Sequence, residues 1–258
     1  MAEQHLFVTE RWEKISNALG AEGRVTVEQV AQELGVSTST IRRDLGRMHK
    51  GGLAIRTRGG AIKPEQVSFD RSLADSLRQQ VSEKEEVGAF AASMIESGDT
   101  VIIDGGATTL QIAKHLRTTM VMVVTNSVDI AYELKGRDGI GLILIGGIVR
   151  GQGGFTYGPA ANSEVSRLSA DKAFVGANGI SAEHGLTAPE PLIADLKSKI
   201  VQQTRQVIVV ADHTKLGHVG LCQVAPIASI HTLVTDRRAT EEQISPFRDA
   251  GVEVIVVR

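Results

Sequence analysis

The sequence predicts an α/β protein in which a small helical N-terminal domain precedes a larger domain built on a mostly parallel sheet. From about residue 100, short β-branched runs alternate with helical segments, as in sheets that helices cover on both faces. Aromatic residues make up only 3% of the chain, so aliphatic side chains must form the core. The first 63 residues instead contain short amphipathic segments separated by glycines.

The first 35 residues predict two helices. The first spans Phe7–Leu19, and glycines follow it. The second starts after Thr26, because Thr26 and Gln29 have the spacing of a capping box. Gly35 should end the second helix, since glycine readily adopts the positive φ that a helix end often requires.

A third helix is predicted from Ser37, with Ile41, Leu45 and Met48 on one apolar face. Two short helices, a tight glycine turn and a helix with exposed arginines form a helix-turn-helix. Small hydroxyls at the helix start, followed by arginines, suit contact with phosphates and base edges of double-stranded DNA. The residues of this helix expected to bind DNA are Ser37, Thr38, Ser39, Thr40, Arg42, Arg43 and Arg47.

A hairpin is predicted next, with a strand at 53–56, a turn at 57–60 and a returning strand at 61–62. Such a wing would put Arg56 and Arg58 beside the recognition helix, where they suit the DNA backbone or minor groove. A solvated hairpin tip is the alternative. We expect a winged helix-turn-helix domain at residues 1–63, a linker at 64–81 and the larger domain at 82–258.

Charge is distributed unevenly along the chain. The net charge is −2, but residues 1–63 carry 10 basic against 7 acidic residues, or +3, and the rest carry 18 against 23, or −5. Within 37–63 the count is 7 against 1, the single acid being Asp44. A basic segment on an acidic chain indicates a local site for a polyanion. A solvated basic face is the alternative.

The larger domain should begin with a helix over Ser82–Glu96, where Ser82 and Glu85 have capping-box spacing. A less regular helical pattern over 68–82 predicts a connecting helix. The predicted strands are Thr100–Ile103, Val121–Thr125, Gly141–Ile145, Ala173–Val175, Val207–Ala211, Leu233–Thr235 and Val252–Val257. The predicted helices between them are Thr108–Leu116, Ser127–Lys135, Ala160–Leu168, Pro191–Gln203 and Thr240–Ala250.

Polar residues follow several of these strands, and ligands of parallel sheets bind at the carboxyl ends of the strands. The segment 104–109, Asp-Gly-Gly-Ala-Thr-Thr, leads into a helix whose N-terminus offers free N–H groups to a phosphate. A capped turn is the alternative. A neutral-to-cationic pocket with hydroxyl-binding groups favours a small phosphorylated polyol. The residues expected to bind such an effector are Asp104, Gly105, Gly106, Thr108, Thr109, Asn126, Gly147, Lys197, Asp212 and Lys215.

Several other functions lack their motifs. The segment after Ile103 has neither the lysine and spacing of a nucleotide-binding loop nor G-x-G-x-x-G. The seven histidines are scattered and Cys222 is the only cysteine, so we expect no metal, no cofactor and a reducing, cytoplasmic location. Cys222 should be buried. No apolar run is long enough for a membrane span, and residues 1–5 do not suggest a signal peptide.

Two other functions remain open. Asp104, Lys197, Asp212 and Lys215 could move protons in a sugar-phosphate isomerase carrying an accessory DNA-binding module. A DNA-architectural protein without an effector is the third possibility, although it leaves the polar strand ends unexplained.

The chain resembles the DeoR family of bacterial transcription regulators, of the glycerol-3-phosphate-repressor type. The resemblance implies a winged-helix domain and a sensor domain similar to the sugar-phosphate isomerase fold. It further implies repression of a sugar-catabolism operon and a response to a phosphorylated intermediate, which we expect to release the protein from its operator. Because a single winged helix reads only a few base pairs, we also expect a homo-oligomer, a dimer or tetramer, on repeated or palindromic half-sites. The chain departs from the family at 105–107, where Ser-Gly-Thr is more common, and at His213, where Ser is common. The matching stretches are 25–45, 56–61, 104–109, 124–126, 146–147, 174–176, 179–180, 185–187, Lys197 and 211–215.

Overall fold

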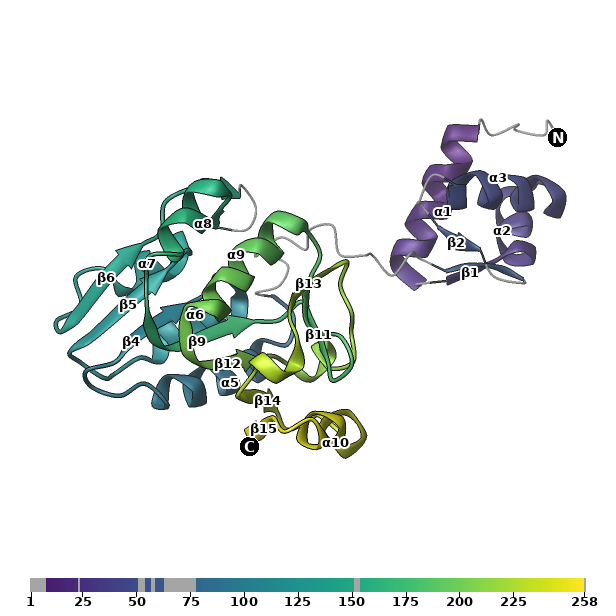
Figure 1. The fold of residues 1–258 in the computed structure, drawn as a ribbon. Helices are drawn as coiled ribbons and strands as arrows, with labels where there is room; N and C mark the ends of the chain where they lie inside the picture. The colour runs from purple at the N-terminus through teal and green to yellow at the C-terminus, as the bar shows by residue number, and fades with distance from the viewer. Residues whose placement is uncertain are drawn as a thin grey trace. The chain divides into compact units, whose positions relative to one another are not determined.

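The computed structural model describes residues 8–22, 24–50, 54–56, 59–62, 78–150 and 154–257. The chain divides into two compact units, Met1–Ser68 and Phe69–Arg258, which can be followed by colour in Figure 1. No helix among these residues has both the length and the apolar character needed to cross a membrane.

The N-terminal unit packs three helices against a small antiparallel sheet, whose strand order is β1-β3-β2. Gly60 allows β1 and β3 to meet, because a Cβ at that position would lie 1.9 Å from the Val25 carbonyl oxygen. Strand β1 was not predicted. The elements are α1 (Val8–Glu22), β1 (Arg24–Thr26), α2 (Val27–Leu34), α3 (Thr38–Lys50), β2 (Ile55–Arg56) and β3 (Gly60–Ile62).

Local chemistry sets the ends of α2 as expected. The Thr26 hydroxyl accepts a hydrogen bond from the Gln29 N–H at 3.2 Å, and Gly35 takes the left-handed conformation with φ 64°. The Gln29 side chain donates to the Glu33 carboxylate at 3.4 Å. Helix α1 passes through Gly20 to Glu22, beyond the predicted end at Leu19.

The second unit contains a seven-stranded, all-parallel sheet in the order β15-β14-β12-β9-β4-β5-β6. Each of the seven predicted runs overlaps one of its strands, three of them extending one residue beyond it, and this confirms the α/β class. The strands are β4 (Thr100–Ile103), β5 (Val121–Thr125), β6 (Ile140–Leu144), β9 (Ala170–Gly176), β12 (Thr204–Val210), β14 (Thr232–Asp236) and β15 (Glu253–Val257).

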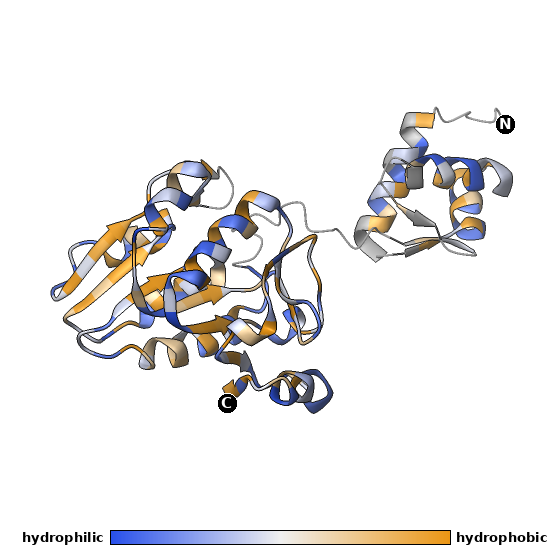
Figure 2. Ribbon diagram, in the orientation of Figure 1, coloured by the Kyte–Doolittle hydropathy of each residue, from blue (hydrophilic) through white to orange (hydrophobic). Residues whose placement is uncertain are grey.

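Helices cover both faces of this sheet and create two apolar cores. One core joins α5, α6 and α7 to the sheet through residues such as Val87, Ile112 and Ile130. The other joins α8, α9 and α10 through residues such as Val165, Ile200 and Phe247. Figure 2 shows the strands as mostly apolar, as expected for strands buried on both faces. The helices are α5 (Val81–Ser93), α6 (Ala107–His115), α7 (Val128–Leu134), α8 (Pro159–Val165), α9 (Pro191–Gln202) and α10 (Glu241–Asp249).

The order of the strands creates a switch point between β4 and β9. From β4 the chain builds outward through β5 to β6, and then returns to the other side of β4 to form β9, β12, β14 and β15. The connections that leave β4 and β9 therefore lead to opposite faces of the sheet. A crevice at the carboxyl ends of these two strands is the usual ligand site of such a fold.

Smaller elements were not predicted. A hairpin pairs β7 (Ile148–Arg150) with β8 (Phe155–Tyr157). An antiparallel sheet joins β10 (Gly179–Ser181), β11 (Gly185–Ala188) and β13 (Cys222–Ala225) in that order. Short 3-10 turns, η1 (His213–Lys215) and η2 (Ile227–Ser229), complete the unit.

Two local predictions were wrong. Ser82 does not cap α5, because the helix begins at Val81 and its N-cap, Gln80, takes a left-handed conformation without a side-chain cap. Cys222 is half-buried rather than buried, since it lies in β13, at the side of the small antiparallel sheet. The connecting helix expected over 68–82 falls largely outside the described residues.

Candidate functional site

The start of α3, the helix predicted to bind DNA, is held by hydroxyl groups. The Ser37 Oγ accepts a hydrogen bond from the Thr40 N–H at 3.2 Å. It also lies 2.7 Å from the Ser39 hydroxyl and 2.9 Å from that of Thr40. Ser37 and Ser39 are exposed, and Thr38 and Thr40 are partly so. The N-terminal end of α3 therefore presents a cluster of polar groups to solvent.

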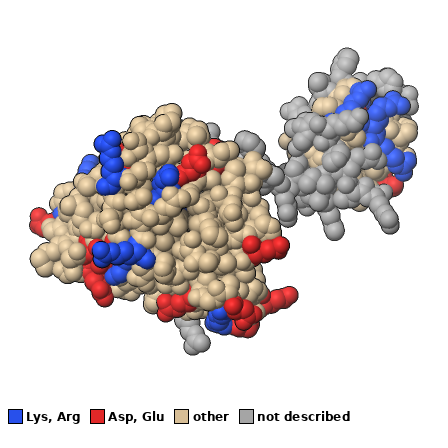
Figure 3. Space-filling view, viewed as in Figure 1, with Lys and Arg blue, Asp and Glu red and all other residues tan. Residues whose placement is uncertain are grey.

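Arginines continue this surface along α3. Arg42, Arg43 and Arg47 are exposed, whereas Ile41, Leu45 and Met48 are buried in the core of the unit. Basic side chains gather on the side of the N-terminal unit where α3 lies (Figure 3). Arg42 has an acidic neighbour, since its Nη2 lies 3.8 Å from the Glu28 Oε1, but both side chains remain more than half exposed.

Asp44, the single acid of the basic segment, lies on the inner face of α3. It is 2% exposed, and its Oδ2 lies 2.8 Å from the Nε of Arg11 in α1. The carboxylate therefore compensates a buried guanidinium and ties α3 to α1. Because it faces the interior, this carboxylate does not neutralise the outward-facing arginines.

The wing is only partly described. Strands β2 and β3 pair in register, with Arg56 opposite Ala61, so the predicted hairpin is present. The side chain of Arg56 and the whole of Arg58 lie outside the described residues.

In the second unit, the switch point holds a buried ion pair. Asp104 follows β4, and its Oδ2 accepts a hydrogen bond from the Lys197 ammonium of α9. The same ammonium donates to the Gly176 carbonyl oxygen at the end of β9, at 2.6 Å. Asp104 also accepts from the Gly176 N–H at 3.3 Å. Both residues are at least 94% buried, and the carboxylate of Asp104 offsets the charge of Lys197.

The glycine loop after Asp104 is braced by the neighbouring strand end. The Gly105 N–H donates to the Asn126 Oδ1 at 2.8 Å, and the Asn126 amide donates to the Thr156 carbonyl at 3.0 Å. A Cβ on Gly105 would lie 2.7 Å from the Cβ of Phe155. The loop, the end of β5 and the β7–β8 hairpin thus pack closely together.

Helix α6 begins directly after this loop and has no side-chain cap. Its N-cap is Gly106, whereas the hydroxyl of Ser127 caps the adjacent helix α7. The Thr109 hydroxyl donates to the Gly106 carbonyl at 3.0 Å, so it stabilises the turn. Thr108 is 8% exposed. The uncapped N-terminus of α6 has the features of an anion site.

The other predicted residues lie at further strand ends. Asp212 follows β12 and is 1% exposed, and its carboxylate accepts hydrogen bonds from the backbone N–H and the hydroxyl of Thr214. Lys215 is half-buried in the same turn. Gly147 follows β6 with φ 146°, where a Cβ would lie 2.7 Å from the Tyr157 carbonyl oxygen.

Sequence reasoning missed the buried carboxylate that fixes this turn. Asp236, at the end of β14, is fully buried and accepts a hydrogen bond from the His213 N–H at 2.6 Å. The His213 Nδ1 lies 3.0 Å from the Asp236 Oδ1. The polar ending of the Leu233 strand could have indicated this position, because the other polar strand ends were identified in the same way.

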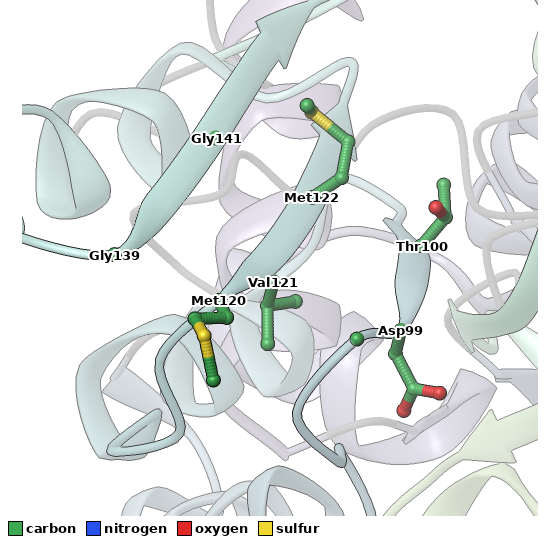
Figure 4. A pocket seen from close by; sticks show the side chains of 8 residues that line it. Asp99, Thr100, Met120, Val121, Met122, Gly139 and Gly141 are labelled. Atoms are coloured by element: carbon green, nitrogen blue, oxygen red, sulfur yellow. The ribbon is translucent and has the colours of Figure 1, made fainter.

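Among the described residues, no metal-ligating cluster lies beside these strand ends, and an open hollow lies at the other edge of the sheet. No group of three or more metal-ligating side chains occurs within the parts of the chain that the structure describes. An open hollow of ≈ 280 Å³ lies beside Met120, Met122 and Gly141, at the amino ends of the strands (Figure 4). That edge is opposite to the one where Asp104 and Asn126 meet.

Comparisons with known proteins agree on one family. The DeoR-like helix-turn-helix domain matches residues 11–67, and the DeoR C-terminal sensor domain matches residues 79–237. The HTH-type transcriptional repressor GlcR of Bacillus subtilis is 38% identical over 251 residues, covering 97% of both chains. A putative aga operon transcriptional repressor of Escherichia coli O157:H7 is 32% identical, over 96% of this chain and 94% of its own.

Among solved structures, the full-length sorbitol operon regulator SorC of Klebsiella pneumoniae is similar with a TM-score of 0.41 and 15% identity, covering 92% of this chain and 97% of its own. The two family models together match most of this chain, and the two repressors align with it over at least 96% of its length. The chain belongs to the DeoR family of transcriptional regulators.

Proposed function

We propose that this protein represses a sugar or polyol catabolic operon and leaves its operator when a phosphorylated sugar binds the second unit. Its membership of a family of DNA-binding regulators supports the first half of this proposal. The observation that carries the second half is the convergence of an uncapped helix N-terminus with Asp104, Asn126 and Lys197 at the β4/β9 switch point.

In this proposal the phosphate binds the N–H groups at the start of α6, beside Thr108 and Thr109. The sugar hydroxyls bind the carboxylate of Asp104 and the amide of Asn126. An effector that binds more tightly to the arrangement with weak operator affinity lowers the protein's affinity for its operator. The size of this decrease is set by the difference between the effector's affinities for the two arrangements. Typical couplings of this kind are about 1–3 kcal/mol.

Operator binding is tested by neutralising Arg42 and Arg43. The operator is first obtained by selecting fragments of the flanking genomic DNA with the wild-type protein. The double alanine variant should bind the operator at least 100-fold more weakly, and each lost phosphate contact should lower the slope of log K against log salt by about 0.9. Changing exposed Arg167 and Arg205 of the second unit to alanine removes the same charge and is the control. Equal operator binding by both variants would exclude α3 as the recognition helix.

The effector site is tested by thermal unfolding in the presence of a panel of sugar phosphates. A ligand at 100 times its dissociation constant stabilises the folded chain by about 2.7 kcal/mol. Thr108→Val with Thr109→Val should abolish that shift and keep operator binding. If no sugar phosphate shifts the wild-type protein, the effector class is wrong.

The isomerase alternative is separated by a turnover assay. The relatives reported above are named as transcriptional repressors, and we therefore expect no conversion of pentose or hexose phosphates. Measurable turnover that Lys197→Met abolishes would instead support an enzyme with an accessory DNA-binding module.

A further inference from the structure

A line of hydrogen bonds runs from the turn after β12 to the first turn of α5. The turn is η1, with Asp212 as its N-cap, and Asp212 and Lys215 are among the residues expected to bind the effector. Helix α5 is the first element of the second unit in the part of the chain that the structure describes. The line therefore joins a predicted effector contact to the helix that follows the N-terminal unit in the chain.

The buried carboxylate of Asp236 forms the middle of this line. Its Oδ2 accepts a hydrogen bond from the His213 N–H at 2.6 Å, and the His213 Nδ1 lies 3.0 Å from its Oδ1. The same Oδ1 accepts from the Arg238 N–H at 2.9 Å. One carboxylate thus holds the backbone of the turn with one oxygen and the backbone after β14 with the other.

Two ion pairs continue the line to α5, which packs beside β14 (Figure 1). The Arg238 Nη1 donates to the Glu83 Oε1 at 2.9 Å, and the Arg237 Nη2 lies 3.5 Å from the Glu86 Oε1. Residues three apart lie on the same side of a helix, so the consecutive arginines bind one side of the start of α5. The Glu83 side chain is 13% exposed, which shields this pair from the solvent that weakens exposed ion pairs.

Burial makes the Asp236 carboxylate sensitive to the position of the turn. A buried carboxylate that loses a hydrogen-bond donor is strongly disfavoured. If a ligand draws the turn toward itself, the carboxylate either follows the His213 N–H or stays with the Arg238 N–H. It satisfies both only when the turn is in its present place. A displaced turn therefore changes what holds Arg238, and packed elements of this kind switch between discrete arrangements.

We propose that Asp236, Arg238 and Glu83 transmit effector binding at the 212–215 turn to the start of α5, and through it to the N-terminal unit. All three are positioning residues that act through other groups. The proposal rests on the proposed function for the nature of the signal, whereas the link between the turn and α5 belongs to the second unit alone. Such a link acts in both directions, because coupling between two sites is reciprocal.

The first test is amide hydrogen exchange of the full-length chain without DNA or effector. Glu83→Gln should raise exchange of the amides at 215–216, which donate to carbonyl groups within the turn, by about five-fold. Glu85→Gln is the matched control, because it makes the same change on the same helix but its partner is His115, at 3.7 Å. Equal exchange in the turn of the two variants would overturn the proposal.

The reverse direction is tested with Asp236→Asn. An amide has only one accepting atom, so either the turn or Arg238 loses its hydrogen bond. Exchange of the amides at 84–88 in α5 should rise by about five-fold, while exchange in α7 should not change. His213→Ala removes only the ring and should cause a smaller rise at the same amides. Unchanged exchange at 84–88 in folded His213→Ala would refute the link, even if Asp236→Asn does not fold.

The functional test measures the factor by which a sugar phosphate weakens operator binding. Arg238→Met should reduce this factor by about five-fold and leave effector affinity without DNA, measured by calorimetry, within about two-fold of wild type. Arg248→Met is the control, because Arg248 pairs with Glu241 inside α10. A wild-type factor in Arg238→Met would contradict the proposal. A wild-type protein that no sugar phosphate releases would contradict the proposed function instead, and the exchange measurements would still decide whether the turn and α5 are linked.

Discussion

Replacing Lys197 by methionine tests how the switch point is stabilised. The change keeps the length of the side chain and removes the ammonium, so Asp104 retains only the Gly176 N–H, at 3.3 Å, among its hydrogen bonds described above. A carboxylate that is 2% exposed would then be buried without its counter-charge. Removing one member of such a pair costs about 3–5 kcal/mol, a large part of the 5–15 kcal/mol typical of a domain.

The measurement is urea unfolding followed by two probes. The single tryptophan, Trp12, belongs to the N-terminal unit, so its fluorescence reports that unit. Far-ultraviolet circular dichroism is dominated by the larger second unit. We expect the Lys197→Met variant to lower the unfolding midpoint of the circular dichroism transition and to leave the fluorescence transition in place.

A double variant supplies the control. Asp104→Leu combined with Lys197→Met replaces both charges with apolar groups and should recover most of the lost stability, because well-packed apolar residues often replace a buried ion pair without loss. A loss below about 1 kcal/mol in the single variant would show that water reaches the pair. Burial would then not explain how the pair stabilises the fold.

Three other changes have defined outcomes. Gly185→Ala should lower the free energy of unfolding by about 2 kcal/mol or more, since φ is 69° and the new Cβ would meet the Ala225 carbonyl oxygen at 2.1 Å; an unchanged urea midpoint would contradict this. The side-chain hydrogen bond from Arg238 is the main cause that lowers the pKa of Glu83 from 4.5 to about 2. Glu83 therefore stabilises the fold fully above pH 4.5 and loses this effect toward pH 2, so the melting temperatures of wild type and Glu83→Gln should converge in acid; a constant difference would refute the assignment. Asp44→Asn should destabilise the N-terminal unit by about 3–5 kcal/mol, measured by tryptophan fluorescence.

The sequence predicted the main sheet well because buried strands and amphipathic helices leave local patterns. Thr100–Ile103 and Val121–Thr125 were predicted with their observed bounds. Their continuous apolar character arises from burial on both faces. Gly35 and Thr26 were likewise predictable, since each controls only the few residues around it.

The remaining elements depend on distant partners. Strand β1 has three residues and exists because it pairs with β3, more than 30 positions later. The β7–β8 hairpin and the small antiparallel sheet are short and rich in glycine, so no periodicity identifies them. Ser82 had a suitable neighbour for capping, but α5 starts one residue before it.

The candidate site was predicted as a set of strand ends, but not as a set of contacts. Sequence alone placed Asp104 and Lys197 at the same sheet edge. It did not show that they neutralise each other, because the strand order determines which ends become neighbours. The importance of Asp236 was missed for the same reason, since its partner His213 comes from another strand end.

The pairing of Asp104 with Lys197 has a consequence for the order in which the protein matures during synthesis. The two residues are 93 positions apart, and contacts over such separations form only after a long stretch of chain has closed. The N-terminal unit, with its own core, can fold while this stretch is still being made. A newly made chain would therefore complete the N-terminal unit before it could form the Asp104–Lys197 pair, and a chain truncated ahead of α9 would keep the surface of α3 but lack the effector site proposed above.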